Sequence, residues 1–180
     1  MFLQKTSIAA MALALGGCAS IMVPAQRVEA PQSDKALVTF VREAVFLGDG
    51  LDIDLWDGTT YVGSLGAGKM IQYETKPGKH LFMGSSENWS YADADLEAGK
   101  QYYLKANIFP GLVYGRVALG VVKQDDLRVP KWQATLKPTQ APADAREKKE
   151  SSGRFGVEKA MAQFEAGGVG FTKVNAEHAR

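Results

Sequence analysis

Cysteine and histidine are scarce in this sequence of 180 residues, which contains one Cys and two His. One cysteine excludes a disulfide within the chain, and this inventory cannot assemble a zinc site from Cys and His. Apolar runs are also short, since none reaches the roughly 18 to 20 residues that a membrane-spanning helix requires. Neither sign of charge is in excess, with 21 Lys and Arg against 20 Asp and Glu. Because nucleic-acid-binding proteins are usually basic, we expect no nucleic-acid partner.

The remaining composition is typical of a globular protein, with 46% hydrophobic and 23% charged residues. A chain of this length buries roughly two-thirds of the surface that its unfolded form exposes. We therefore expect one compact core that forms without a disulfide or a structural metal.

The first 17 residues have the order of a secretory signal peptide. Met1–Ser7 carries one positive charge at Lys5, and Ile8–Leu15 is an unbroken apolar run. At 1.5 Å per residue this run gives a helix of about 12 Å, far less than the roughly 30 Å core of a bilayer. We therefore expect residues 1–17 to be a targeting segment that is removed, and not a membrane span.

The end of this segment, Leu15-Gly16-Gly17-Cys18, resembles the lipobox of bacterial lipoproteins. The resemblance implies cleavage between Gly17 and Cys18, a diacylglyceryl thioether on the Cys18 sulfur and acylation of the new amino terminus. Two or more acyl chains hold a protein firmly on a membrane, whereas one chain binds marginally. Ala19 replaces the aspartate that retains many enterobacterial lipoproteins in the inner membrane, so the resemblance implies the periplasmic face of the outer membrane. The alternative is a conventional secreted protein with an unmodified thiol.

The chain after Cys18 divides into three parts. Residues 18–34 contain two prolines and no sustained hydrophobic period, which predicts a tether. Residues 35–137 are dense in strand and turn signals, and Ala36–Glu43 is apolar on both faces, as expected for a covered central strand. The other candidate strands are Leu51–Leu55, Tyr61–Leu65, Lys69–Thr75, Lys79–Ser85, Trp89–Leu96, Gln101–Phe109, Leu112–Lys123 and Trp132–Leu136. Seven or eight short strands among these nine candidates predict an all-β fold, an antiparallel β-sandwich, with a barrel as the alternative.

Two turn motifs predict how these strands connect. Asp57-Gly58 is a hairpin signal, because glycine accepts the positive φ of a type I′ turn. Lys76-Pro77-Gly78-Lys79 places Pro and Gly at the positions that specify a type II turn. We therefore expect an antiparallel hairpin around each motif.

Residues 138–180 differ in character from the strand-rich part. Residues 142–152 are rich in charge and have little to bury, which predicts a solvated helix or a linker. Val157, Met161 and Phe164 then recur at the spacing of a short amphipathic helix. We expect that helix to dock on the sandwich, with a detachable partner-binding element as the alternative, and the glycine-rich end to be loose.

Four motifs lie within residues 34–122: Asp57-Gly58, Gly63-Ser64-Leu65, Pro77-Gly78-Lys79-His80-Leu81 and Gly99-Lys100-Gln101-Tyr102-Tyr103. Together they resemble a family of bacterial lipoprotein domains of unknown function related to PEGA-type repeats. The resemblance implies a small Ig-like or PEGA-like β-sandwich on an envelope lipoprotein. It supplies no catalytic residues.

Candidate catalytic residues are few. His80 follows a predicted turn, where a half-buried strand residue is the default, and His178 lies in the expected loose end. No serine stands in a Gly-x-Ser-x-Gly motif, and Cys18 is excluded as a nucleophile if it is lipidated. We therefore expect no catalytic residues and no enzymatic activity, with a hydrolase that uses His80 as a less favoured alternative.

Three acidic residues, Asp52, Asp54 and Asp57, precede Gly58 and are the best candidates for a cation site. Their spacing departs from the EF-hand loop, and Gly63 stands where that loop requires a glutamate. Strand alternation and turn chemistry already explain the three carboxylates. We expect no bound metal and no cofactor.

Three aromatic residues, Trp56, Trp89 and Tyr103, form the candidate ligand face, since exposed aromatics can mark a recognition surface. On an alternating strand Tyr103 points away from Tyr102, so one of the two is expected to face outward. The favoured hypothesis is a non-enzymatic envelope lipoprotein that binds another envelope component, a protein or a glycan. The alternative is a small-molecule or glycan binder that uses a cavity between the sheets.

Overall fold

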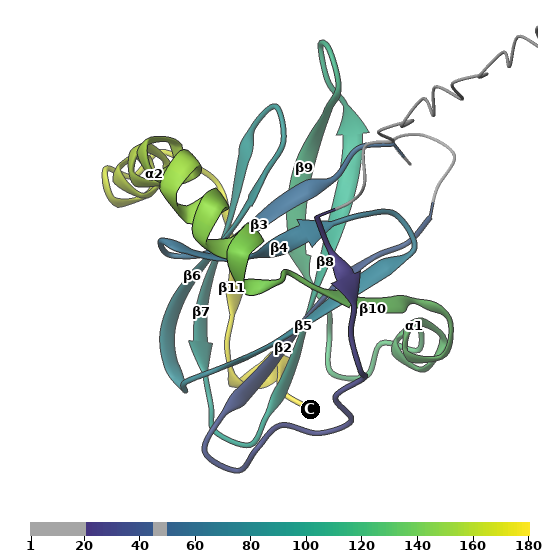
Figure 1. Ribbon diagram of the computed structural model, residues 1–180. Helices are drawn as coiled ribbons and strands as arrows, with labels where there is room; N and C mark the ends of the chain where they lie inside the picture. The colour runs from purple at the N-terminus through teal and green to yellow at the C-terminus, as the bar shows by residue number, and fades with distance from the viewer. Residues whose placement is uncertain (1–20, 45–49) are drawn as a thin grey trace, which may run out of the picture.

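The computed structural model describes residues 21–44 and 50–180. The expected signal peptide, its cleavage site between Gly17 and Cys18, and the expected lipidation site lie outside the described residues. The described chain forms four layers, in which two β-sheets pack face to face and a helix covers the outer face of each sheet (Figure 1). Among the described residues, no helix combines the length and the apolar character needed to cross a membrane.

The first sheet has six strands, with β2 near its centre. In spatial order they are β1 (Val23–Pro24), β10 (Lys137–Gln140), β5 (Lys69–Thr75), β2 (Ala36–Arg42), β8 (Gln101–Pro110) and β9 (Gly115–Val121). Every residue of β2 is buried, which confirms the predicted central strand covered on both sides.

The second sheet has five strands. In spatial order they are β11 (Phe171–Val174), β7 (Trp89–Leu96), β6 (Gly78–Ser85), β3 (Ile53–Asp57) and β4 (Thr60–Leu65). The hairpin predicted at Asp57-Gly58 is present, with Asp57 opposite Thr60. Gly58 has a φ of +54°, but no non-glycine residue of the described chain has a positive φ. The turn is therefore not type I′, which needs positive φ at two successive positions.

The main core fills the space between the two sheets. It takes the inward side chains of both, including Phe40 and Tyr102 from the first sheet and Leu55 and Phe82 from the second. The Phe40 and Phe82 rings meet edge to face at 5.4 Å between centroids. Two smaller clusters lie on the outer faces, one under each helix.

The expectation of purely antiparallel sheets was wrong, because three strand pairs are parallel. β2 pairs with β8, β10 with β5, and β11 with β7 in this direction. Parallel partners cannot be joined by a tight turn, so they come from distant parts of the chain. Turn motifs in the sequence report only on neighbouring strands and could not show these pairs.

The strands on either side of Lys76-Pro77-Gly78-Lys79 do not pair with each other, so the hairpin expected there was wrong. β5, before the turn, belongs to the first sheet, whereas β6, after the turn, belongs to the second. Gly78 has a φ of +116°, a conformation that favours glycine. The turn therefore carries the chain from one sheet to the other.

Residues 132–136, predicted as a last strand, lie in α1 (Val129–Thr135) and at its carboxyl end. Pro130 occupies the first turn of this helix, where its missing N–H removes no helical hydrogen bond. Trp132 and Leu136 are buried one helical turn apart, whereas Ala134 is exposed. A spacing of four residues fits both a strand, with period 2, and a helix, with period 3.6. In a strand Ala134 would share the buried face of Trp132 and Leu136, so its exposure is typical of the helix.

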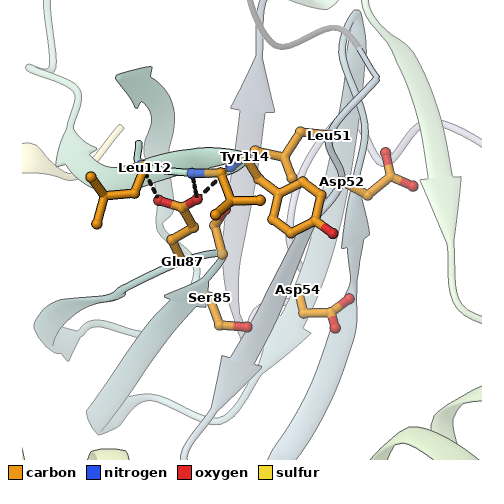
Figure 2. A pocket seen from close by; sticks show the side chains of 9 residues that line it. Leu51, Asp52, Asp54, Ser85, Glu87, Leu112 and Tyr114 are labelled. Carbon is orange, nitrogen blue, oxygen red and sulfur yellow. Dashed lines mark hydrogen bonds between the residues drawn. The ribbon is translucent and has the colours of Figure 1, made fainter. Parts of the chain in front are cut away.

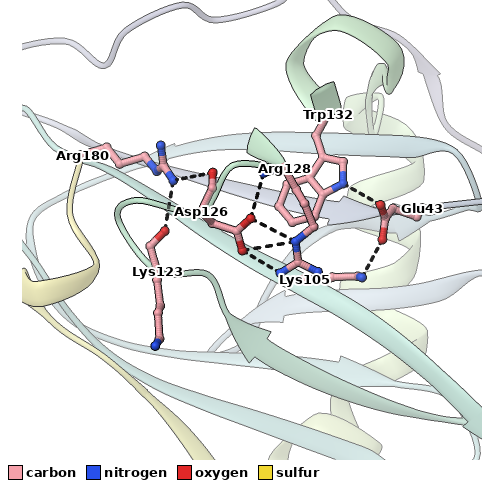
Figure 3. A network of polar contacts seen from close by, with 7 residues as sticks. All are labelled: Glu43, Lys105, Lys123, Asp126, Arg128, Trp132 and Arg180. Atoms are coloured by element: carbon pink, nitrogen blue, oxygen red, sulfur yellow. Dashed lines mark hydrogen bonds and ion pairs between the residues drawn. The ribbon is translucent and has the colours of Figure 1, made fainter. Parts of the chain in front are cut away.

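A polar network fixes α1 on the outer face of the first sheet (Figure 3). Trp132 Nε1 donates to Glu43 Oε1 at 2.9 Å, and Lys105 Nζ lies 2.6 Å from Glu43 Oε2. The hydrogen bond from Lys105, followed by that from Trp132, lowers the pKa of the Glu43 carboxyl. The Arg128 guanidinium lies 5.0 Å from the centroid of the Trp132 ring and pairs with Asp126.

The part of the predicted tether, residues 18–34, that the structure describes, from residue 21 on, belongs to the folded body. β1 pairs antiparallel with β10 and so extends the first sheet. The backbone N–H of Val28 donates to Gln72 Oε1 at 2.8 Å, and Gln72 Nε2 donates to the Val28 carbonyl at 2.7 Å. The segment has no hydrophobic period because it lies along the edge of a sheet and makes polar contacts.

The carboxyl-terminal part is built into both sheets, and the expectation of a loose end was wrong. The two predicted helical stretches form one helix, α2 (Ala143–Glu165), of which Val157 and Ala160 are buried. As predicted, the Val157, Met161 and Phe164 stripe packs on the sandwich. β11 and a short 3-10 helix, η1 (Ala176–His178), follow. Gln101 and Arg180 then exchange two backbone hydrogen bonds at 3.1 and 2.9 Å.

Candidate functional site

A depression of about 720 Å³ lies on the described surface, where three connections between strands meet. It is an open groove between the start of β3, the β6–β7 turn and the β8–β9 turn (Figure 2). We call it the groove, and its lining residues are Leu51, Asp52, Asp54, Ser85, Ser86, Glu87, Leu112, Val113 and Tyr114.

One wall of the groove ends in the apolar tip, defined as Leu112, Val113 and Tyr114. These residues form the turn between β8 and β9 and are 100%, 77% and 80% exposed. Phe109, at the end of β8, is 52% exposed and adds to the same apolar region. Three consecutive large apolar side chains at this exposure are unusual on a folded domain.

Glu87 holds the backbone of the apolar tip. Its carboxylate accepts hydrogen bonds from the backbone N–H groups of Leu112 at 2.8 Å, of Val113 at 2.5 Å and of Tyr114 (Figure 2). The bond from Tyr114, with those from Val113 and Leu112, lowers the pKa of the Glu87 carboxyl below its ordinary value. The turn is therefore ordered by its backbone while its side chains contact solvent.

The opposite wall carries two carboxylates. Asp54 Oδ2 lies 2.6 Å from Lys149 Nζ of α2, and Asp54 Oδ1 accepts hydrogen bonds from the hydroxyls of Ser64 and, at 3.2 Å, Tyr61. Burial, aided by the Asp54 charge, raises the pKa of the Tyr61 phenol. Asp52 is exposed at the rim. The groove thus combines an apolar lip with one exposed and one neutralised carboxylate.

The groove residues do not form a hydrolytic arrangement. Ser86 Oγ donates to the carbonyl of Gly115. His80 lies on β6 five positions before Ser85, which corresponds to about 16 Å along a strand. A serine and its general base must instead lie within about 3.2 Å.

His80 is engaged in an ion pair elsewhere. Its Nδ1 lies 2.8 Å from an Asp57 carboxylate oxygen, and its Nε2 lies 2.8 Å from the Lys76 carbonyl oxygen. The hydrogen bond to Asp57 is the main cause that raises the pKa of the His80 imidazole. Because both ring nitrogens face acceptors, the geometry favours the imidazolium, and neither nitrogen is positioned to take a proton from a substrate.

The three acidic residues suggested for a cation site do not point toward one common site. Asp57 pairs with His80 and Asp54 with Lys149, whereas Asp52 lies at the groove rim. Within residues 21–44 and 50–180, no group of three or more His, Cys, Asp or Glu side chains is placed to hold a metal ion.

The candidate ligand face was wrong for two of its three residues. Trp56 is 3% exposed beneath α2, and Tyr103 is 1% exposed beneath α1. Trp89 is half-buried and packs against the Trp56 cluster, away from Tyr103. The reason is that each sheet has a helix on its outer face, so residues on both sides of a strand are covered. Tyr102 and Tyr103 are both buried for the same reason.

The apolar tip and Glu87 were missed in the sequence. Leu112 and its neighbours were assigned to a strand, whereas β9 begins at Gly115. A signal was present, because three large apolar residues directly follow Pro110-Gly111, a pair that ends a strand. Glu87 gave no signal, since its partners are backbone groups that only the fold brings near.

Comparisons with protein-family models, with curated proteins and with solved structures found no match for this chain.

Proposed function

We propose that the protein is a non-enzymatic lipoprotein of the bacterial envelope, anchored through acylated Cys18 on the periplasmic face of the outer membrane. The observation that carries this proposal is the Leu15-Gly16-Gly17-Cys18 sequence, which follows a short apolar run. Residues 1–17 would be removed as the signal peptide. An Ig-like or PEGA-like identity for the sandwich remains part of the proposal.

The distance between the proposed anchor and the folded body is short. The Met22 side chain packs against the core, and its sulfur accepts a hydrogen bond from the Ser64 backbone N–H at 3.2 Å. Met22 follows Cys18 by four positions, so these Cα atoms can lie at most about 14 Å apart. The body would therefore lie next to the membrane surface rather than at the end of a long tether.

The groove and its apolar tip are the surface best suited to bind another envelope component. They combine a depression of about 720 Å³ with three consecutive exposed apolar side chains, among them Leu112, which is 100% exposed. A small-molecule or glycan site between the sheets has less support, because buried side chains of both sheets occupy that space. A hydrolase has less support as well, since both nitrogens of His80 are engaged.

The test of the anchor is the substitution Cys18→Ser in the full chain, with Ser20→Ala as the matched control that retains the thiol. We expect fatty-acid labelling and membrane fractionation of the wild type and of Ser20→Ala, and neither for Cys18→Ser. Mass spectrometry should find the acyl chains on an amino-terminal Cys18. Equal membrane association of all three proteins without fatty acid would contradict the proposal.

A further inference from the structure

We infer that the apolar tip inserts into the lipid leaflet that carries acylated Cys18, so that the body touches the membrane at a second place. The inference rests on the proposed function and names the envelope component that this surface binds. The tip residues Leu112 and Val113 would lie among the lipid headgroups and upper acyl chains, with the Tyr114 ring at the interface. Tyrosine is enriched at that depth because its ring is apolar and its hydroxyl is polar.

The first support is the shape and composition of the apolar tip. The β8–β9 hairpin extends beyond the neighbouring strands, so the tip is a projection and not a cleft (Figure 1). Leu127 and Phe155 are also highly exposed, at 92% and 80%, but each has a charged residue next to it in sequence and no apolar neighbour there. A projecting apolar tip fits a deformable lipid phase, whereas a protein partner would need a matching pocket.

The second support is that three backbone N–H groups of the tip already have an acceptor. Three consecutive N–H groups, those of Leu112, Val113 and Tyr114, donate to Glu87. An unpaired backbone N–H costs several kcal/mol when it leaves water for a lipid phase. The Glu87 bonds supply that acceptor, so these N–H groups would lie no deeper than the Glu87 carboxylate, at the level of the headgroups, and only the side chains would reach the acyl chains.

The third support is the position of the tip relative to the start of the described chain. Asp52 lines the groove next to the tip, and it also lines a second depression that Met22 and Pro24 form. The groove and this second depression therefore adjoin at Asp52. Because Cys18 can lie at most about 14 Å from Met22, the proposed anchor would lie near the part of the body where the groove and this depression adjoin.

Charge near the tip is compatible with a membrane surface. Arg116 is exposed and follows the tip by two positions, where it can meet anionic headgroups. Glu87 and Asp52 stand behind the tip on the groove walls. These carboxylates would limit insertion to the three tip residues.

The experiment places an environment-sensitive fluorescent amino acid at position 112 of the acylated protein in phosphatidylethanolamine–phosphatidylglycerol vesicles. The matched control carries the same probe at position 127, which is also almost fully exposed. Equal thermal unfolding confirms that both proteins are folded. We expect a blue shift and at least threefold stronger quenching by brominated lipid at position 112 than at position 127. Equal emission and quenching at the two positions would overturn the inference.

Two further outcomes separate this inference from the proposed function. If mass spectrometry finds no fatty acid on Cys18, the proposed function fails; the tip is then tested on chain coupled through its single thiol to a maleimide lipid in the same vesicles. Quenching at position 112 in that sample supports insertion, and its absence overturns it. A probe that is shielded in whole envelopes but water-exposed on protein-free vesicles also overturns the inference and indicates a protein partner.

Discussion

Two glycines of α2 give a prediction with an internal control. The face of α2 that packs on the second sheet carries Gly153 and Gly156, each over a tryptophan. A Cβ at position 153 would lie 2.9 Å from Trp56 Cη2 and 3.0 Å from Trp56 Cζ2. At position 156 the nearest atom, Trp89 Cζ2, would be 3.8 Å away, an ordinary contact.

Both substitutions reduce the conformational entropy of the unfolded chain by the same amount, and they differ in how the new methyl group packs. Replacing glycine by alanine inside a helix stabilises it by about 1 kcal/mol, because the unfolded chain loses conformational freedom. Gly153→Ala must also displace the rigid, buried Trp56 ring, and such overpacking costs about 1–3 kcal/mol. We expect Gly156→Ala to be about 1 kcal/mol more stable than wild type, and Gly153→Ala to be unchanged or up to about 2 kcal/mol less stable.

The assay is urea and thermal unfolding of the two variants and the wild type, followed by circular dichroism. A difference of about 1–3 kcal/mol between the variants corresponds to roughly 2–12 °C in Tm for a chain of this size. The near-ultraviolet spectrum, which depends on tryptophan packing, should change for Gly153→Ala alone. Equal stabilisation by both substitutions would refute the reasoning, because it would mean that α2 does not approach Trp56 this closely.

Three further predictions concern polar contacts. His80→Gln removes the ion pair with Asp57, which raises the pKa of the His80 imidazole above 6.5. The loss in unfolding free energy should therefore be largest below about pH 6.5 and should shrink as pH rises through the raised pKa. A difference in unfolding free energy that does not depend on pH would contradict this. Hydrogen bonds from the guanidinium and the backbone N–H of Arg128 lower the pKa of Asp126 to about 2, so the Asp126 carboxyl carbon should titrate near pH 2 by NMR. The contribution of this carboxylate to stability should be present above pH 3.8 and be lost as pH falls through about 2. A midpoint near 3.8 would show that the pair does not persist in solution. Trp132→Phe removes the Nε1–H donor to Glu43 and leaves space where the buried indole lay, so it should cost at least about 1.5 kcal/mol in urea unfolding, whereas an unchanged midpoint would mean that neither the bond nor the packing contributes.

The strands between residues 35 and 122 could be predicted from the sequence because their signals are local. Alternation in β8 and the double-sided apolar character of β2 depend only on neighbouring residues. The sheet partners could not be predicted, since parallel pairs such as β2 with β8 join distant segments. The alternation of apolar and polar residues along a strand predicts which side chains are buried only when one face of the sheet is known to be exposed to solvent.

The candidate site was predicted poorly for a related reason. Trp56 and Tyr103 were chosen as exposed aromatics, but Trp56 lies under α2, whose docking was predicted without its position on the sheet, and Tyr103 lies under α1, which was predicted as a strand. The apolar tip is visible in the sequence only as three apolar residues after a turn. Its exposure depends on where the β8–β9 hairpin ends relative to the rest of the body.

The order in which the strands are made has a consequence for folding. β11 pairs with β7, β10 closes on β5, and the last residue, Arg180, bonds to Gln101. Pairings between such distant residues are formed slowly, because a long loop must close before any contact is gained. A partly synthesised chain lacks β11, an edge strand of the second sheet, and β10, which joins β1 to β5 in the first sheet, so neither sheet is complete. We therefore expect the nascent chain to remain open until its last segment is available, which is the state that passage through a narrow protein-conducting channel requires.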